Sequence, residues 1–254
     1  MTKRNAGQEE QPKILVMDIE TAPGVAYIWR LFGDNFVPLE RLISPSRVIS
    51  WGAQWYGSRE VMYSDEKRAG TQKMLAQIHR LMSQADAYVT FNGDKFDIPM
   101  LSGAFVEQGF DALPPTASID LYKTVKKLGL MSGKLEFVAP FLKIGQKVKH
   151  EGFGLWRSVL AGDREAWGRM RQYNIQDVRL TSKLYSLLLP YIKNHPRLFP
   201  KVKDRPTCRV CSSSHIIFRG SYFTKENQYT RTQCQDCGSW DKFKRKPQKQ
   251  GEAE

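Results

Sequence analysis

The hydrophobic pattern of the chain predicts alternating strands and helices. Residues 13–21, KILVMDIET, begin with a continuous apolar run and end in two acidic residues. Such a run is typical of a strand buried on both faces of a sheet. Further along, the pattern predicts a hairpin over 47–63, a helix over 70–84 and a short buried strand over 87–91 that runs into the turn Asn92-Gly93.

Helical periodicity dominates the following hundred or so residues. Helices are predicted over 95–109, 121–128, 134–142 and 165–189, with a basic, glycine-bearing loop at 145–153. A strand, a hairpin, a second strand and several helices indicate an α/β domain with a mixed sheet flanked by helices.

Composition changes mark the domain organisation. Pro, Lys and Arg are frequent between residues 193 and 206, which predicts a linker. We therefore expect a flexible leader at 1–12, a large domain at 13–192, the linker at 193–206, a small cysteine-bearing unit at 207–243 and a basic, disordered tail at 244–254.

The net charge of +13 predicts a polyanionic partner. Residues 191–254 contain 14 Lys and Arg against 6 Asp and Glu, so they account for +8 of that charge. Aromatic residues are interleaved with these cations, a combination that favours nucleic acid as the partner. A basic tail that only aids solubility is the simpler interpretation.

The sequence predicts neither a membrane-spanning segment nor a signal peptide. No apolar run approaches the roughly 20 residues that span a bilayer. The polar N-terminus lacks the apolar centre of a signal peptide. We therefore expect no membrane partner and a cytoplasmic location, in a bacterium or in a phage-infected host cell.

All four cysteines lie in one short segment and predict a zinc site. Cys208 and Cys211 form one C-x2-C pair, Cys234 and Cys237 form another, and 22 residues separate the pairs. Four thiolates close the tetrahedral sphere of zinc, which indicates one structural Zn²⁺ in a small β-hairpin unit, a zinc ribbon. Disulfides are the alternative, but they are rare in the cytoplasm.

Two acidic residues end the first predicted strand. Side chains alternate along a strand, so Asp18 and Glu20 point to the same side. Two neighbouring carboxylates at the end of a buried strand repel each other and favour a bound cation. A solvated strand end is the alternative interpretation.

Two later acids match this pair. Asp97 lies in the first turn of the helix at 95–109, where an ordinary acid favoured by the helix dipole is the alternative. Tyr173 and Asp177 are four residues apart and therefore share one helix face. A solvated acid paired with Arg179 or Lys183 is the alternative for Asp177.

These residues form three motifs that resemble those of a known family. Asp18-Ile19-Glu20, Asn92-x-x-x-Phe96-Asp97 and Tyr173-x-x-x-Asp177 are similar to the exonuclease motifs of DnaQ-like 3′–5′ exonucleases, within the ribonuclease H-like superfamily. The resemblance covers about residues 13–189. The second motif resembles that of family B DNA polymerase proofreading domains and of related stand-alone phage and bacterial exonucleases.

The resemblance implies a ribonuclease H-like fold and a two-metal nuclease. The acids Asp18, Glu20, Asp97 and Asp177 would hold two Mg²⁺ or Mn²⁺ ions, and Tyr173 would orient the attacking water. The reaction would hydrolyse phosphodiester bonds from 3′ ends of DNA, preferably single-stranded. Phe96 and Asn92 would contact the substrate, with a role in bracing the loop as the alternative for Asn92. Lys147 of the basic loop is expected to contact substrate phosphates, and a solvated basic loop is the alternative.

The residues leave several functions open. The same chemistry on RNA, as a 3′–5′ exoribonuclease, is one alternative. A non-catalytic nucleic-acid-binding adaptor on the same fold is another, and a structure-specific endonuclease is a third. The zinc ribbon would either grip nucleic acid or contact a replication or repair protein.

Overall fold

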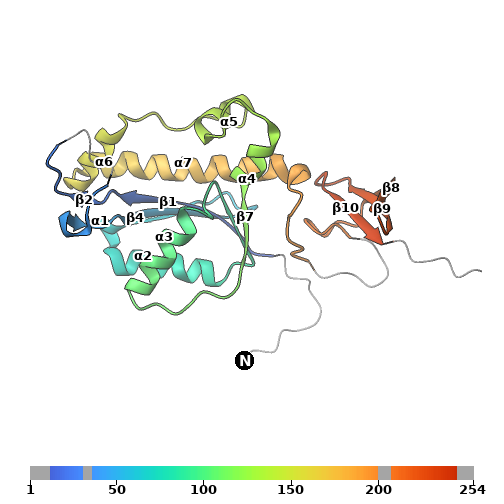
Figure 1. Cartoon of the computed structure of the whole chain (residues 1–254), viewed down its shortest axis with the longest axis horizontal. Helices are drawn as coiled ribbons and strands as arrows, with labels where there is room; N and C mark the ends of the chain where they lie inside the picture. Colours follow the sequence, from blue (N-terminus) through green and yellow to red (C-terminus); the bar gives the residue numbers. More distant parts are fainter. Residues whose placement is uncertain (1–11, 31–35, 200–206, 245–254) are drawn as a thin grey trace, which may run out of the picture. The chain divides into compact units, whose positions relative to one another are not determined.

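The computed structural model describes residues 12–30, 36–199 and 207–244, and Figure 1 shows the chain. The chain divides into two compact units, residues 1–185 and 186–254. The predicted leader up to residue 11, residues 200–206 of the predicted linker and the tail from residue 245 lie outside the described residues. The predicted domain limits stay a prediction.

A five-stranded mixed sheet forms the centre of the first unit. Its strand order is β5-β4-β1-β6-β7, with β1 in the middle. The strands are β1 (Ile14–Ala22), β4 (Arg47–Trp55), β5 (Met62–Asp65), β6 (Ala87–Thr90) and β7 (Ala117–Asp120). β1 is antiparallel to β4 and parallel to β6. The first four residues of β1 are buried, as the apolar run predicts.

Helices cover both faces of this sheet (Figure 1). On one side lie α2 (Thr71–Ser83) and α3 (Asp97–Glu107), and on the other lie α6 (Phe153–Leu160) and the long α7 (Arg164–Leu188). Leu15, Met17 and Ile19 of β1 belong to the core cluster that contains residues of α2 and α3. Because side chains alternate along a strand, Asp18 and Glu20 point to the opposite face, toward α7.

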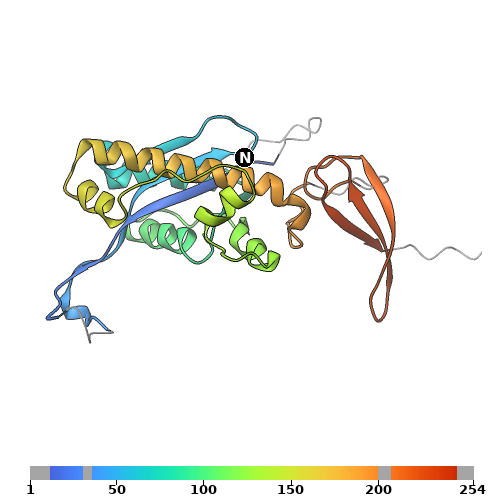
Figure 2. The same ribbon diagram turned by 90° about the horizontal axis from the view of Figure 1, so that it is seen from above.

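Shorter elements complete the unit, and Figure 2 shows it from above. They are β2 (Val25–Ala26), η1 (Leu39–Arg41), β3 (Leu42–Ser44), α1 (Glu66–Ala69), α4 (Leu121–Val125), η2 (Lys126–Leu128) and α5 (Leu135–Phe141). The sequence pattern did not predict α6. This helix is anchored by Trp156, whose Nε1 atom donates to the carbonyl of Thr21 at 3.1 Å.

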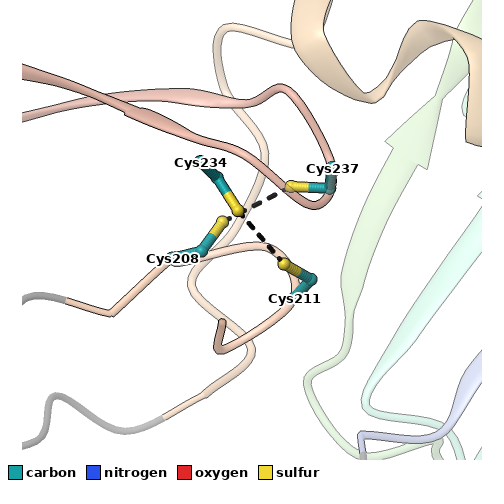
Figure 3. A group of neighbouring side chains, drawn as sticks. All are labelled: Cys208, Cys211, Cys234 and Cys237. Carbon is teal, nitrogen blue, oxygen red and sulfur yellow. Dashed lines mark hydrogen bonds between the residues drawn. The ribbon is translucent and has the colours of Figure 1, made fainter. Parts of the chain in front are cut away.

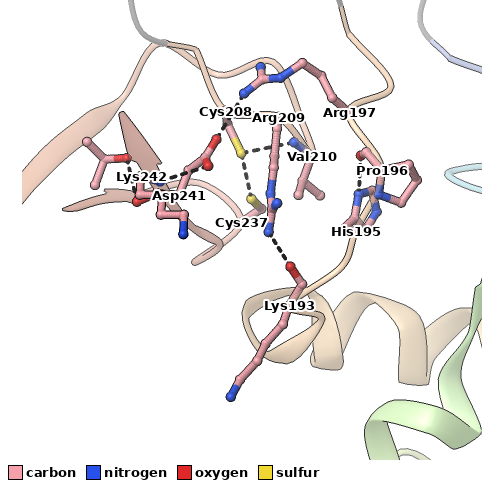
Figure 4. Close-up of polar contacts among 11 residues, drawn as sticks. Lys193, His195, Pro196, Arg197, Cys208, Arg209, Val210, Cys237, Asp241 and Lys242 are labelled. Carbon is pink, nitrogen blue, oxygen red and sulfur yellow. Dashed lines mark hydrogen bonds and ion pairs between the residues drawn. The ribbon is translucent and has the colours of Figure 1, made fainter. Parts of the chain in front are cut away.

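The second unit contains η3 (Leu189–Tyr191) and a three-stranded antiparallel sheet of order β10-β9-β8. The strands β8 (Ile216–Phe223) and β9 (Gln228–Cys234) form the predicted hairpin, and β10 (Trp240–Lys244) adds a strand that was not expected. Polar contacts connect the segment before the cysteines to this sheet and to the first cysteine turn (Figure 4). Arg197 pairs with Asp241 at 3.0 Å, and Arg209 donates to the carbonyl of Lys193 at 2.9 Å.

Among the described residues, no helix combines the length and the apolar character that crossing a membrane would require.

Candidate active site

Three carboxylates meet between the central strand and the long helix. Asp18 and Glu20 of β1 and Asp177 of α7 each offer an oxygen, and these oxygens all lie within 4.8 Å of one another. Glu20 and Asp177 are buried, and Asp18 is partly buried. The structure therefore brings together three of the four acids that the sequence singled out.

A glycine allows the helix to approach the sheet at this point. Gly52 of β4 lies opposite Asp18 in the strand register. A Cβ atom at Gly52 would lie 2.9 Å from Cγ2 of Val178 and 3.1 Å from Oδ1 of Asn174. The missing side chain thus opens the space in which α7 presents Asp177 to β1, a role that the sequence analysis missed.

Asn174 is a second residue that the sequence analysis missed. It is fully buried, and its Nδ2 atom donates to Oδ2 of Asp18 at 2.7 Å and to the carbonyl of Asp18 at 3.2 Å. An Asn in the middle of a helix with apolar neighbours is a signal that could have revealed it, because Asn competes for backbone hydrogen bonds in that position.

Asp97 lies beside the three-carboxylate group but outside it. It is the first residue of α3, and its Oδ1 atom accepts a hydrogen bond from the amide of Ile19 at 3.1 Å. The turn before α3 is tight, because a Cβ atom at Gly93 would lie 2.4 Å from the Thr90 side chain. This turn places the Asp97 carboxylate against the backbone of β1 at Ile19, between Asp18 and Glu20.

Burial raises the pKa values of all four acids, and the charges of neighbouring acids of the group raise those of Asp18 and Glu20 further. For Asp18, burial raises the pKa most, followed by the charges of Asp97, Asp177 and Glu20. Burial and the charge of Asp177 raise the pKa of Glu20 to about 8. Burial raises the pKa of Asp97 to about 7. Burial also raises the pKa of Asp177, against the opposing charge of Lys147.

This donor set suits a hard divalent cation. Oδ1 of Asp177 is buried and has no hydrogen-bond partner in the described part of the chain. Carboxylate oxygens are the preferred ligands of Mg²⁺ and Mn²⁺. A cation between these acids would neutralise their repulsion and satisfy the unpaired oxygen.

The predicted loop at 145–153 places a lysine against the acids. Nζ of Lys147 lies 2.7 Å from Oδ2 of Asp177 and donates to the Tyr173 hydroxyl at 2.7 Å. Burial alone would lower the pKa of Lys147, but the charge of Asp177 and these hydrogen bonds raise it above its ordinary value. The rings of His150 and Trp156 pack edge-on against Tyr173, with centroids 4.9 and 6.1 Å away.

A cavity of about 430 Å³ opens beside the acids. Its lining includes Asp18, Asp177, Phe91, Asn92, Tyr122 and Lys147. Oδ1 of Asp120 accepts hydrogen bonds from the amides of Asn92 and Tyr122, at 2.8 and 3.0 Å, and so connects two walls of the cavity. Phe96 is 43% exposed and does not line this cavity. The substrate contact expected for Phe96 stays a prediction.

The four cysteines cluster in the second unit (Figure 3). They are free thiols, with Sγ atoms 3.5 Å apart for Cys208 and Cys237 and 3.6 Å apart for Cys211 and Cys234. Sulfur atoms that bind one zinc tetrahedrally at about 2.3 Å are about 3.8 Å apart. The cluster could therefore hold one metal ion with little rearrangement.

A family model describes most of the first unit. The model of the RNase_H superfamily matches residues 44–189, which is more than half of the chain. The chain belongs to the RNase_H superfamily. Its α/β fold, with a mixed sheet flanked by helices, confirms the predicted ribonuclease H-like class. The matched residues include Asp97 and Asp177, while Asp18 and Glu20 precede them.

This RNase_H superfamily chain was also compared with curated proteins and with solved structures. No curated protein matches the sequence. Among solved structures, the chain is similar to the RNase D of Trypanosoma brucei, with 14% sequence identity and a TM-score of 0.44. The match covers 72% of this chain and 58% of the RNase D chain, and a similarity at this level supports no statement about function.

The superfamily and the acid cluster together support a nuclease. Both the acidic group and the four-cysteine group could hold metal ions.

Proposed function

We propose that the protein is a metal-dependent 3′–5′ exonuclease that removes nucleotides from single-stranded DNA. The observation that carries this proposal is the convergence of three carboxylates from β1 and α7 within 4.8 Å. A protein that only bound nucleic acid would gain nothing from such a group, because carboxylates repel phosphates. Buried acids of this kind are typical of sites that perform chemistry.

Asp18, Glu20, Asp97 and Asp177 would hold two Mg²⁺ or Mn²⁺ ions. When bound, a pair of such ions supplies an activated water and stabilisation of the leaving 3′-oxygen. Asp18 and Asp177 are central to this assignment, since Asn174 orients the first and Lys147 contacts the second. Asp97 would complete the ligand set from its position on the backbone of β1.

Tyr173 would orient the attacking water. Burial and the charge of Asp177 raise the pKa of its phenol, so the hydroxyl stays protonated at neutral pH. The hydroxyl oxygen accepts a hydrogen bond from Lys147, and its proton is directed to the side of Asp177, where the water would lie. Tyr173 therefore acts as a hydrogen-bonding partner of the water rather than as a base.

The cavity beside the acids would take the 3′-terminal nucleotide. Its volume of about 430 Å³ lies within the usual range for ligand sites. The aromatic rings of Phe91 and Tyr122, whose centroids are 5.8 Å apart, would contact the base or sugar. A neighbouring cavity of about 460 Å³ shares Glu136 and Lys147 with the first. It would guide the strand, with Lys147 near the phosphate.

The test uses single-stranded DNA and RNA of one sequence, labelled at the 5′ or at the 3′ end. We expect Mg²⁺-dependent release of mononucleotides from the 3′ end of DNA, with slower release from RNA. Faster release from RNA would identify an exoribonuclease. Internal cuts would identify an endonuclease. Binding with no cleavage by the zinc-loaded protein in Mg²⁺ or Mn²⁺ would identify an adaptor and contradict the proposal.

A further inference from the structure

The three-stranded sheet of the second unit has two chemically different faces. The strand register pairs Tyr222 with Tyr229, Lys242 with Arg231 and Trp240 with Gln233. Paired residues lie on the same face, and the face alternates along each strand. One face therefore carries Ile217, Tyr222, Tyr229, Arg231, Gln233, Trp240 and Lys242. We call these seven residues the aromatic face.

The opposite face is partly buried within its own unit, although Phe218 and Phe223 on it are exposed. It carries Cys234 of the thiol cluster, and Thr232, which is buried. It also carries Asp241, which pairs with Arg197 (Figure 4). The aromatic face differs because its exposed rings, Tyr222 and Trp240 at 42% and 43%, share the face with the exposed side chains of Arg231 and Lys242.

The rings and cations of the aromatic face are arranged together. Nζ of Lys242 lies 4.4 Å from the centroid of the Tyr222 ring and 5.0 Å from that of Tyr229. The two rings are 6.1 Å apart and tilted by 54°. Trp240 precedes Lys242 by two residues on the same face, about 6.8 Å along the strand, twice the rise per residue. The lysine and the two tyrosines thus form one preformed group.

The charge on this face has one sign. Arg231 and Lys242 are its ionisable cations, and none of its seven residues is acidic. Gly220 lies in the bulge of β8 opposite Arg231, and a Cβ atom there would be 3.4 Å from Nη2 of Arg231. The bulge therefore leaves room for the guanidinium group at the surface.

We propose that the aromatic face is a binding site for single-stranded nucleic acid, distinct from the acidic site. Unpaired bases would stack on Trp240 and Tyr222, while Lys242 and Arg231 would contact the phosphates. A duplex cannot bind in this way, because its bases are already stacked inside the helix. The excess of cations in residues 191–254 complements a polyanion and adds to the attraction.

The test measures binding and not cleavage, so it is independent of the proposed nuclease activity. The probe is a 5′-fluorescein oligodeoxythymidylate with phosphorothioate linkages, bound by the full zinc-loaded chain without added Mg²⁺. Tyr222→Leu and Trp240→Leu should each weaken binding about tenfold, the order expected for the loss of one stacked base. Tyr222→Phe and Trp240→Phe, which keep an aromatic ring at the substituted position, should bind like the wild type.

The matched control is Phe218→Leu. Phe218 is an aromatic residue of the same sheet that is 64% exposed, but its register with Thr232 places it on the opposite face. Its replacement should leave the affinity unchanged, and the affinity for a duplex of the same length should be the same in all these variants. Lys242→Ala should reduce the slope of log affinity against log salt by about 0.7.

Two results would overturn the proposal: wild-type affinity in both Leu variants, or an equal loss in Phe218→Leu. The zinc content of each variant is measured to show that the unit remains folded. If a Leu variant loses zinc, the binding site is instead mapped by photochemical cross-linking of a 5-iodouracil oligonucleotide to the wild-type chain. Adducts on Tyr222, Tyr229 or Trp240 support the site, and adducts confined to other residues contradict it.

Discussion

Asn174 of α7 donates a hydrogen bond of 2.7 Å from Nδ2 to Oδ2 of Asp18 on β1. A second bond, from the same atom to the carbonyl of Asp18, is 3.2 Å long. Together they restrict the rotamer of Asp18 and connect the long helix to the central strand where the acids meet. Asn174 is therefore a positioning residue for the proposed metal site.

Replacing Asn174 should weaken the site without removing a ligand. We expect Asn174→Ala to lower nucleotide release by about 10- to 100-fold, the usual effect of losing a group that orients a metal ligand. The Mg²⁺ concentration for half-maximal rate should rise, which a metal titration of the initial rate measures. Gln172→Ala, at an exposed position of the same helix, is the control. An unchanged Mg²⁺ requirement in Asn174→Ala would contradict this role.

Removing a proposed ligand should abolish the reaction. Asp18→Ala and Asp177→Ala should each lower nucleotide release by about 10³-fold or more, since metal ions provide several kcal/mol of transition-state stabilisation. Binding of single-stranded DNA should persist in both variants, as fluorescence anisotropy would show. Asp111→Ala, which removes an exposed acid, should remain fully active. Full activity in either site variant would invalidate the site.

The close approach at Gly52 should be sensitive to a single methyl group. Gly52→Ala should destabilise the protein by about 1–3 kcal/mol, because the added Cβ atom would crowd Val178 and Asn174. Activity should fall as well, since α7 carries Asp177. Gly103→Ala is the matched control: a Cβ atom there meets nothing within 4 Å in α3, so this variant should be neutral or slightly more stable. Equal unfolding midpoints for the two variants in urea would disprove the packing argument.

The metal-free protein should lose stability as the pH rises. The folded acids have raised pKa values, about 8 for Glu20 and about 7 for Asp97, whereas unfolded carboxyls titrate near 4. Between about pH 4 and pH 8 the folded state thus binds more protons than the unfolded state, so the free energy of unfolding falls with increasing pH.

Thermal unfolding between pH 5 and pH 8.5 measures this dependence. Glu20→Gln should make the unfolding midpoint less dependent on pH. Mg²⁺ should raise the unfolding midpoint of the wild type most at the highest pH. Other groups titrate in both proteins, so the difference between wild type and Glu20→Gln isolates the acid cluster. Identical slopes for the two would show that the raised pKa of Glu20, caused by burial and by the charge of Asp177, does not affect folding.

The second unit should bind one zinc ion per chain. Cys208→Ser and Cys237→Ser should each lose it, and residues 207–244 should then become susceptible to proteolysis, because so small a unit depends on its metal. His215→Ala should keep its zinc, since His215 hydrogen-bonds Asp236 and is not part of the four-thiol group. Metal analysis measures the stoichiometry. A zinc-free wild-type protein without titratable thiols would indicate disulfides instead.

Local patterns in the sequence determined much of this protein. The apolar run at 14–17 predicted β1, helical periodicity predicted α2, α3 and α7 within a few residues, and the cysteine spacing predicted the thiol cluster. Periodicity, turn residues and paired cysteines act over short distances along the chain, so the sequence displays them directly.

Tertiary structure decided which of these features meet. Asn174 and Asp18 are far apart along the chain, so no local sequence pattern predicts their contact. Gly52 opposite Asp18 is a single residue and produces no periodic pattern that could reveal its role. The placement of Asp97 beside the three-carboxylate group, the lysine bound to Asp177 and the extra strand β10 are likewise consequences of packing. Such contacts depend on how two elements approach each other in space, and that approach is encoded by the whole core rather than by any one segment.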